Sequence, residues 1–239
     1  MSYRKSLPAV RRGLTVAAAL MVAAGIADCA AYSFPLSARD GILGGSLLGS
    51  SSVHATLGEV MSGADGTYID RILADRDSSI ERWTDHVAQP LRIWIDSTAA
   101  LSGRQTAFPA AVRAAVSEWA TTGIPLRFAY VERQGDADIR VHWTAYLEHK
   151  TGSTTWRTDR NGWLMNSDIT LATHISDGEP LDGRGMRAIA LHEVGHALGL
   201  SHSYDPHDIM APLVHVDGLS MKDRNTIKLL YSLPAGRVR

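Results

Sequence analysis

Three histidines and one glutamate lie at a spacing that can build a metal site. The segment 192–202 reads HEVGHALGLSH, so His192 and His196 are four residues apart. On a helix, residues four apart share one face, and both imidazoles can therefore bind a single ion. Neutral imidazole is a ligand that suits zinc. Glu193 lies about 100° further around such a helix, where its carboxylate stands beside the metal and not on it.

Gly199 and His202 complete this constellation. Glycine can adopt the left-handed conformation that ends a helix, so Gly199 predicts a sharp turn that brings His202 round as a third ligand. Three protein ligands leave one position open for water, as in a catalytic zinc site, whereas a structural site is closed by a fourth ligand. The spacing therefore predicts one catalytic Zn²⁺, with Glu193 as the general base toward the attacking water.

The elements that must position this segment can be predicted from its surroundings. Alternating apolar and polar residues over 91–96 indicate a half-buried strand. Further strands are predicted at 126–131, 137–143 and 163–172, with a short edge strand at 152–156. Apolar residues at helical spacing predict a helix that buries Phe108, Val112, Ala115, Val116 and Trp119.

Two more helices are predicted, over 185–198 and 221–230. Ser220 and Asp223 have the spacing of a capping box at the start of the second one. Strands followed by two helices, with one helix inserted early, predict an α+β domain in which helices pack on a sheet.

The zinc segment and the DIMAP run at 208–212 resemble the zinc motif and Met-turn of the metzincins. Ser203 directly follows the third histidine, and in this the segment resembles that of the matrixins, the matrix-metalloproteinase-like branch of that clan. The resemblance covers about residues 82–234. It implies a twisted mixed sheet of about five strands with three helices, and zinc-dependent endopeptidase activity on protein or peptide substrates.

The resemblance also implies roles for residues after the zinc segment. Met210 would form an apolar floor below the histidines. Pro212, Leu213 and Val214 stand where the family has the wall of the pocket for the residue after the scissile bond, although the family's tyrosine is missing.

Three other family features are not supported by the sequence. Cys29 is the only cysteine and lacks the surroundings of the matrixin cysteine switch, so latency would need another ligand, for which Asp40 and Asp65 are the candidates. The spacing of a structural zinc site is absent, and His149 and His174 are wrongly placed for one. Clustered acids of a calcium site are not apparent either.

Composition and the N-terminus bound the remaining possibilities. A net charge of −1 gives no basic field for nucleic acid, and 45% hydrophobic residues argue against global disorder. Basic residues before the apolar run 14–27 predict a signal peptide over 1–31, and hence export to a secreted, periplasmic or cell-surface location. The alternative is an uncleaved membrane anchor, against which the shortness of the run argues. Only in that case would the protein contact a membrane.

The predicted organisation is therefore a signal or anchor at 1–31, a Gly/Ser-rich pro-segment or linker at 32–81 with little core of its own, and a catalytic domain at 82–239. Two other functions stay open at this point. One is a zinc-binding interaction module without catalysis, against which the intact Glu193 argues. The other is a zinc hydrolase acting on a different amide, such as cell-wall peptide crosslinks.

Overall fold

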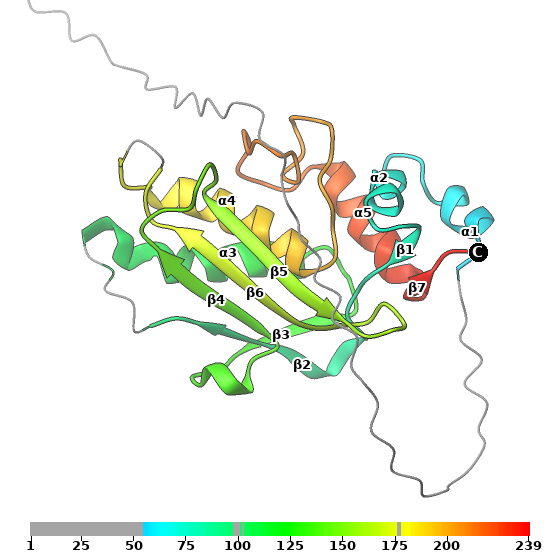
Figure 1. Ribbon diagram of the computed structural model, residues 1–239, viewed down its shortest axis with the longest axis horizontal. Helices are drawn as coiled ribbons and strands as arrows, with labels where there is room; N and C mark the ends of the chain where they lie inside the picture. Colours follow the sequence, from blue (N-terminus) through cyan, green and yellow to red (C-terminus); the bar gives the residue numbers. More distant parts are fainter. Residues whose placement is uncertain (1–54, 98–100, 102, 176–177) are drawn as a thin grey trace, which may run out of the picture.

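The structure is a computed structural model that describes residues 55–97, 101, 103–175 and 178–239 (Figure 1). The predicted signal or anchor at 1–31, with Cys29, lies outside the described residues, as do Asp40 and the rest of 32–54.

A five-stranded mixed sheet forms the centre of the fold, in the order β3-β2-β4-β6-β5 (Figure 1). Its strands are β2 (His86–Ile95), β3 (Leu126–Tyr130), β4 (Ile139–Thr144), β5 (Gly152–Thr158) and β6 (Leu164–Ala172). Four of them are parallel, and β5 runs antiparallel to β6 at one edge. The predicted fold class and sheet are confirmed.

One strand begins earlier than its sequence pattern predicts. β2 starts at His86, although Pro90 lies inside it and cannot donate a backbone hydrogen bond. The pairing with β3 shifts register between His86 and Leu91, which accommodates the proline. The regular alternation therefore covers only the second half of the strand.

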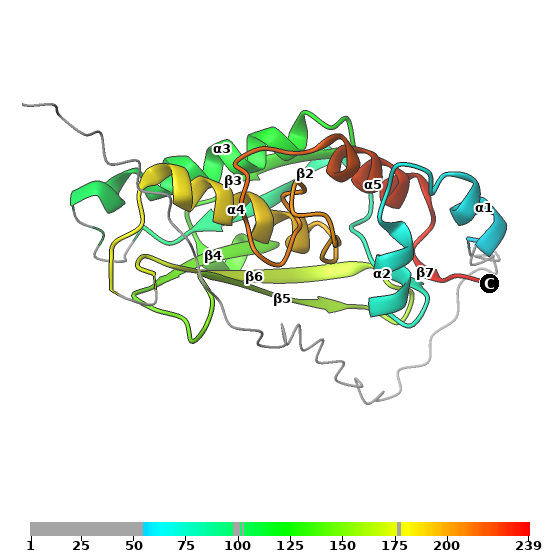
Figure 2. The same ribbon diagram turned by 90° about the horizontal axis from the view of Figure 1, so that it is seen from above.

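Two helices cover one face of the sheet (Figure 2). They are α3 (Phe108–Ala120), which follows a short 3-10 turn at Gly103–Ala107, and α4 (Gly183–Ala197). The side chains that α3 buries are the five predicted from its periodicity. The indole of Trp119 donates a hydrogen bond to the carbonyl of Leu191 at 2.8 Å, which joins the two helices. α4 is buried continuously from Ala188 to Ala197, between α3 and strands β5 and β6.

The remaining elements gather at one end of the sheet (Figure 1). They are α1 (Leu57–Ser62), α2 (Ile69–Asp75), α5 (Met221–Ser232) and the antiparallel pair β1 (Ser79–Ile80) and β7 (Gly236–Arg237). Elsewhere in the fold, a second 3-10 turn, Gln134–Asp136, connects β3 to β4. The predicted capping box of Ser220 and Asp223 opens α5. No helix among the described residues is both long and apolar enough to cross a membrane.

The residues just before position 82 differ from the expected linker. Val60, Ile69, Ile72 and Ile80 are fully buried and belong to the same core as the sheet and α4. The expectation of little core is therefore wrong for residues 55–81. The physical reason is that α1 and α2 are too short to display a helical period, and their burial depends on contacts with distant parts of the chain.

Candidate metal centre

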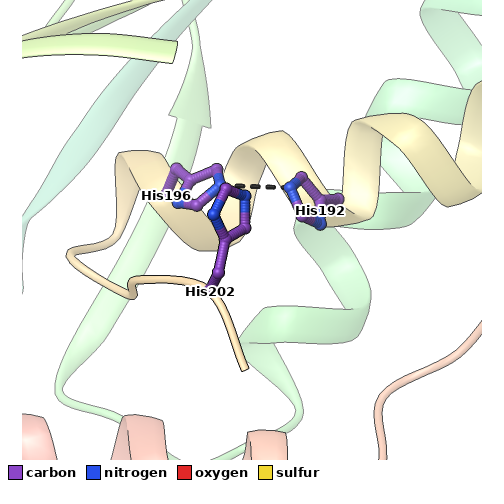
Figure 3. Close-up of side chains that lie close together, drawn as sticks. All are labelled: His192, His196 and His202. Carbon is purple, nitrogen blue, oxygen red and sulfur yellow. Dashed lines mark hydrogen bonds between the residues drawn. The ribbon is translucent and has the colours of Figure 1, made fainter. Parts of the chain in front are cut away.

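The three predicted histidine ligands meet at one point (Figure 3). His192 and His196 project from the same face of α4, and His202 approaches from the loop after it. The Nε2 atom of His196 lies 3.1 Å from Nε2 of His192 and 3.2 Å from Nε2 of His202. Zn–N bonds of about 2.0–2.1 Å in a tetrahedron place two ligand nitrogens about 3.3–3.4 Å apart, so this cluster has the size of a zinc site.

The other ring nitrogens fix the tautomers of the two helical ligands. Nδ1 of His192 is 2.8 Å from the carbonyl of Ile209, and Nδ1 of His196 is 2.8 Å from the carbonyl of Leu200. Because a carbonyl oxygen only accepts, each Nδ1 carries the proton and each Nε2 of a neutral ring presents a lone pair. Lone pairs that face one another at this distance repel unless a cation lies between them. The donor set therefore fits a bound Zn²⁺.

Burial favours the neutral form that ligation requires. Desolvation lowers the pKa of His192 to about 4, with a further lowering by His202. The pKa of His196 lies well below its ordinary value for the same first reason. Desolvation also lowers the pKa of the less deeply buried His202. All three rings are thus free of the proton that would compete with a metal at neutral pH.

Gly199 makes the turn that brings His202 back to the helix. Its φ is +105°, a conformation that side chains with a Cβ rarely adopt. A Cβ at this position would also lie 2.3 Å from the carbonyl oxygen of Glu81. Both the turn and the close approach of the upstream chain therefore require glycine here.

Met210 lies fully buried against the ligand helix. A Cβ on Gly195 would stand 2.3 Å from the Met210 sulfur, so this side chain packs closely against α4 between the two helical ligands. The amide of Ser203 donates to the carbonyl of Met210 at 2.8 Å, and its hydroxyl donates to the buried carboxylate of Asp208. These contacts join the Met210 turn to the loop that carries His202.

Glu193 is buried on α4, one position after His192, and is held by a residue that the sequence patterns did not single out. The hydroxyl of Thr154, on the edge strand β5, donates to the Glu193 carboxylate at 2.6 Å. Burial raises the pKa of Glu193 to about 7, while the Thr154 hydrogen bond and the charge of Lys150 act in the opposite direction. No local signal could have found Thr154, since it lies 39 positions from Glu193 in the sequence.

The proposed pocket residues lie beyond the Met210 turn. Pro212 and Leu213 are exposed and Val214 is half-buried. Among the described residues, the one group of metal-binding side chains that meets within ligand distance is the histidine triad, and Asp65 is not part of it. His149 is exposed, and His174 contacts the hydroxyl of Thr173 at 2.9 Å.

Comparison with known proteins assigns the family. A sequence profile of the matrixin peptidases matches residues 83–232. Matrix metalloproteinase-15 of Homo sapiens is 30% identical over 131 residues, which are 48% of this chain and 19% of that protein. Macrophage metalloelastase of Rattus norvegicus is 31% identical over 121 residues, 46% of this chain and 26% of that protein. The chain therefore belongs to the matrixin family of peptidases.

A viral relative gives a similar result. A putative matrix metalloproteinase of Trichoplusia ni ascovirus 2c is 27% identical over 137 residues, 47% of this chain and 26% of that protein. The matches thus span only about a fifth to a quarter of the length of these relatives.

Proposed function

We propose that this protein is an exported zinc-dependent endopeptidase that hydrolyses peptide bonds in protein or peptide substrates. The observation that carries the proposal is the convergence of three imidazoles, in which Nε2 of His196 lies 3.1 and 3.2 Å from Nε2 of His192 and of His202, with two of the rings oriented by backbone carbonyls. Membership of the matrixin family supports the same activity. His192, His196 and His202 would hold one Zn²⁺, which supplies Lewis acidity and lowers the pKa of a bound water.

Glu193 is the general base of this proposal. Its carboxylate accepts a proton from the attacking water and then delivers that proton to the leaving amine nitrogen. Burial raises the pKa of this carboxyl in the metal-free protein, and a carboxyl group raised in this way holds a proton more readily than an exposed one, as a general base must. The hydrogen bond from Thr154 occupies one carboxylate oxygen, so the other oxygen remains for the proton transfer.

The edge strand β5 is the proposed binding surface for the substrate backbone. Among the described residues it pairs only with β6, and it contacts Glu193 through Thr154. An extended peptide can add to its free edge by main-chain hydrogen bonds, which places a peptide bond beside the histidine cluster. Pro212, Leu213 and Val214 are the proposed wall of the pocket for the residue after the scissile bond.

A chelation experiment tests the activity. The full chain is assayed on a library of quenched peptides as isolated, after removal of metal by a chelator, and after zinc is restored, with bound zinc measured at each stage. We expect about one zinc per chain, with cleavage lost on chelation and regained with zinc. Zinc binding without cleavage of any peptide would contradict the peptidase and favour a zinc-binding interaction module.

A further inference from the structure

The loop between α4 and His202 is held in place by residues outside the matched family region. The carbonyl of Leu200 accepts a hydrogen bond from Nδ1 of His196, so the position of this carbonyl sets the orientation of that ring. The side chain of Arg76, directly after α2, donates from Nη2 to the same oxygen at 3.3 Å. One acceptor thus serves both a metal ligand and an upstream guanidinium.

Arg76 also contacts the residue next to the third ligand. Its Nε donates to the hydroxyl of Ser201 at 3.3 Å, one position before His202. The Arg76 side chain is only 6% exposed, so these contacts lie in a dry environment where a charged hydrogen bond is strong. The planar guanidinium therefore fixes two consecutive residues of the loop from one side.

Glu81 holds Arg76 and extends the arrangement to the edge strand. Its carboxylate accepts from Nη1 of Arg76 at 2.7 Å and from the indole of Trp156, on β5, at 2.9 Å. The guanidinium also lies over the Trp156 ring, 4.8 Å from its centre. The Arg76–Glu81 pair thus joins the end of α2, the proposed substrate strand and the turn at Gly199.

We propose that Arg76 is a positioning residue of the metal centre, which holds Leu200 and Ser201 so that His196 and His202 meet at one point. Residues 55–81 are accordingly part of the site and not a tether to it. Removal of the guanidinium would leave the loop free to sample arrangements in which the ligands do not converge, and the metal would have to order them on binding. The inference rests on the proposed function only in taking zinc as the metal.

The zinc dissociation constant of the full chain tests this inference without any measurement of cleavage. It is obtained by competition with a chromophoric chelator. We expect Arg76→Gln to weaken zinc binding by about 10- to 100-fold, the usual effect of losing a group that orients a ligand. Arg76→Lys keeps the charge beside Glu81 but lacks the planar guanidinium that reaches both Leu200 and Ser201. Its zinc affinity should therefore lie between that of the wild type and that of Arg76→Gln.

Arg82→Gln is the matched control. Arg82 is a second buried arginine, and it pairs with Asp85 and donates to the carbonyls of Trp83 and Leu233. Urea unfolding of the metal-free variants should show stability losses of similar size for Arg76→Gln and Arg82→Gln, with zinc affinity reduced in the first only. Unchanged affinity in Arg76→Gln, or an equal loss in both variants, would overturn the inference, because either result reduces Arg76 to a stabilising residue.

If Arg76→Gln does not fold, Ser201→Ala tests whether Arg76 positions the metal ligands. It removes one acceptor of the guanidinium without leaving an unpaired charge, and we expect zinc affinity to fall several-fold; unchanged affinity would overturn the inference. A wild-type chain that binds zinc but cleaves no peptide would contradict the proposed function and leave this test intact.

Discussion

The metal centre is built by two regions that are held together in different ways. Around α4 the contacts are mostly apolar, with α3 on one side and strands β5 and β6 on the other. Residues 55–81 add apolar anchors of their own, but they reach the site through polar groups. Tyr68 donates at 3.1 Å to Asp223, whose carboxylate accepts from the amide of Ile209 at 2.9 Å, and Arg76 donates to Leu200 and Ser201.

This difference separates two tasks. The apolar contacts around α4 fix the position of this helix and therefore the backbone positions of His192 and His196. The polar contacts from upstream fix the loop after the helix, which lies outside the helices and strands. The more exposed side of a metal site can thus depend on a segment that precedes the matched family region.

The largest effect on zinc binding and cleavage is expected from the loss of a metal ligand on α4. His196→Ala removes the imidazole that contacts both other rings, so zinc binding and cleavage should fall by at least about a thousandfold. Zinc content and peptide cleavage are measured on the same sample. His142→Ala is the control, because His142 lies 3.5 Å from Asp168 and outside the triad, and it should keep both.

A second prediction tests whether residues 55–81 belong to the folded core. Ile72, on α2, is fully buried, so Ile72→Ala should lower the free energy of unfolding by about 2–5 kcal/mol. Urea denaturation measures the loss. Leu57→Ala, on the exposed face of α1, should change stability by less than about 0.5 kcal/mol. A loss for Ile72→Ala as small as that of Leu57→Ala would show that the segment is a tether.

The pH dependence of the metal-free protein separates the buried titrating groups. The pKa of His192 is lowered to about 4 in the fold, so its contribution to stability is present above about pH 6.5 and is lost as the pH falls toward 4. Glu193 acts oppositely: its pKa is raised to about 7, so its contribution is present below about pH 4.5 and is lost as the pH rises through 7.

Glu193→Gln removes the opposing contribution of Glu193, while that of Asp223, whose pKa burial also raises, stays in place. In that metal-free variant we expect stability to fall as the pH is lowered from 6.5 to 4.5, by up to about 1.4 kcal/mol per pH unit for each histidine that gains a proton on unfolding. Urea denaturation at several pH values gives the slope. Stability that is flat or rises over this interval would show that the histidines are not buried in the neutral form.

The smallest effect is expected at Thr154. Thr154→Val keeps the shape but removes the hydroxyl that donates to Glu193, so kcat should fall on the order of tenfold while zinc content stays unchanged. Thr154→Ser should retain most of the activity. Thr155→Val, at the exposed neighbouring position of β5, is the matched control and should have no effect. Equal kcat in Thr154→Val and wild type would show that the Thr154 hydroxyl does not assist Glu193 as general base.

Sequence patterns predicted the parts of the site whose geometry is local. His192 and His196 share a helical face because they are four residues apart, and Gly199 predicted the turn that the structure places after the helix. The face of α3 could be read in the same way. In each case the relevant neighbours lie within a few positions, so the spacing alone carries the information.

The remaining parts depend on contacts between residues far apart in the chain. Arg76 lies 124 positions from Leu200, and Tyr68 lies 155 positions from Asp223. A Gly/Ser-rich segment with two short helices looks like a linker until the surfaces that it packs against are known. The extent of the folded unit could therefore not be predicted from composition.

In the proposed mechanism the histidine triad holds one zinc and Glu193 performs the proton transfers. Zinc content and peptide cleavage, measured together on the wild type and on Glu193→Ala, separate these two roles. We predict about one zinc per chain in both proteins and cleavage only in the wild type. Cleavage by Glu193→Ala at the wild-type rate, with zinc still bound, would contradict the account.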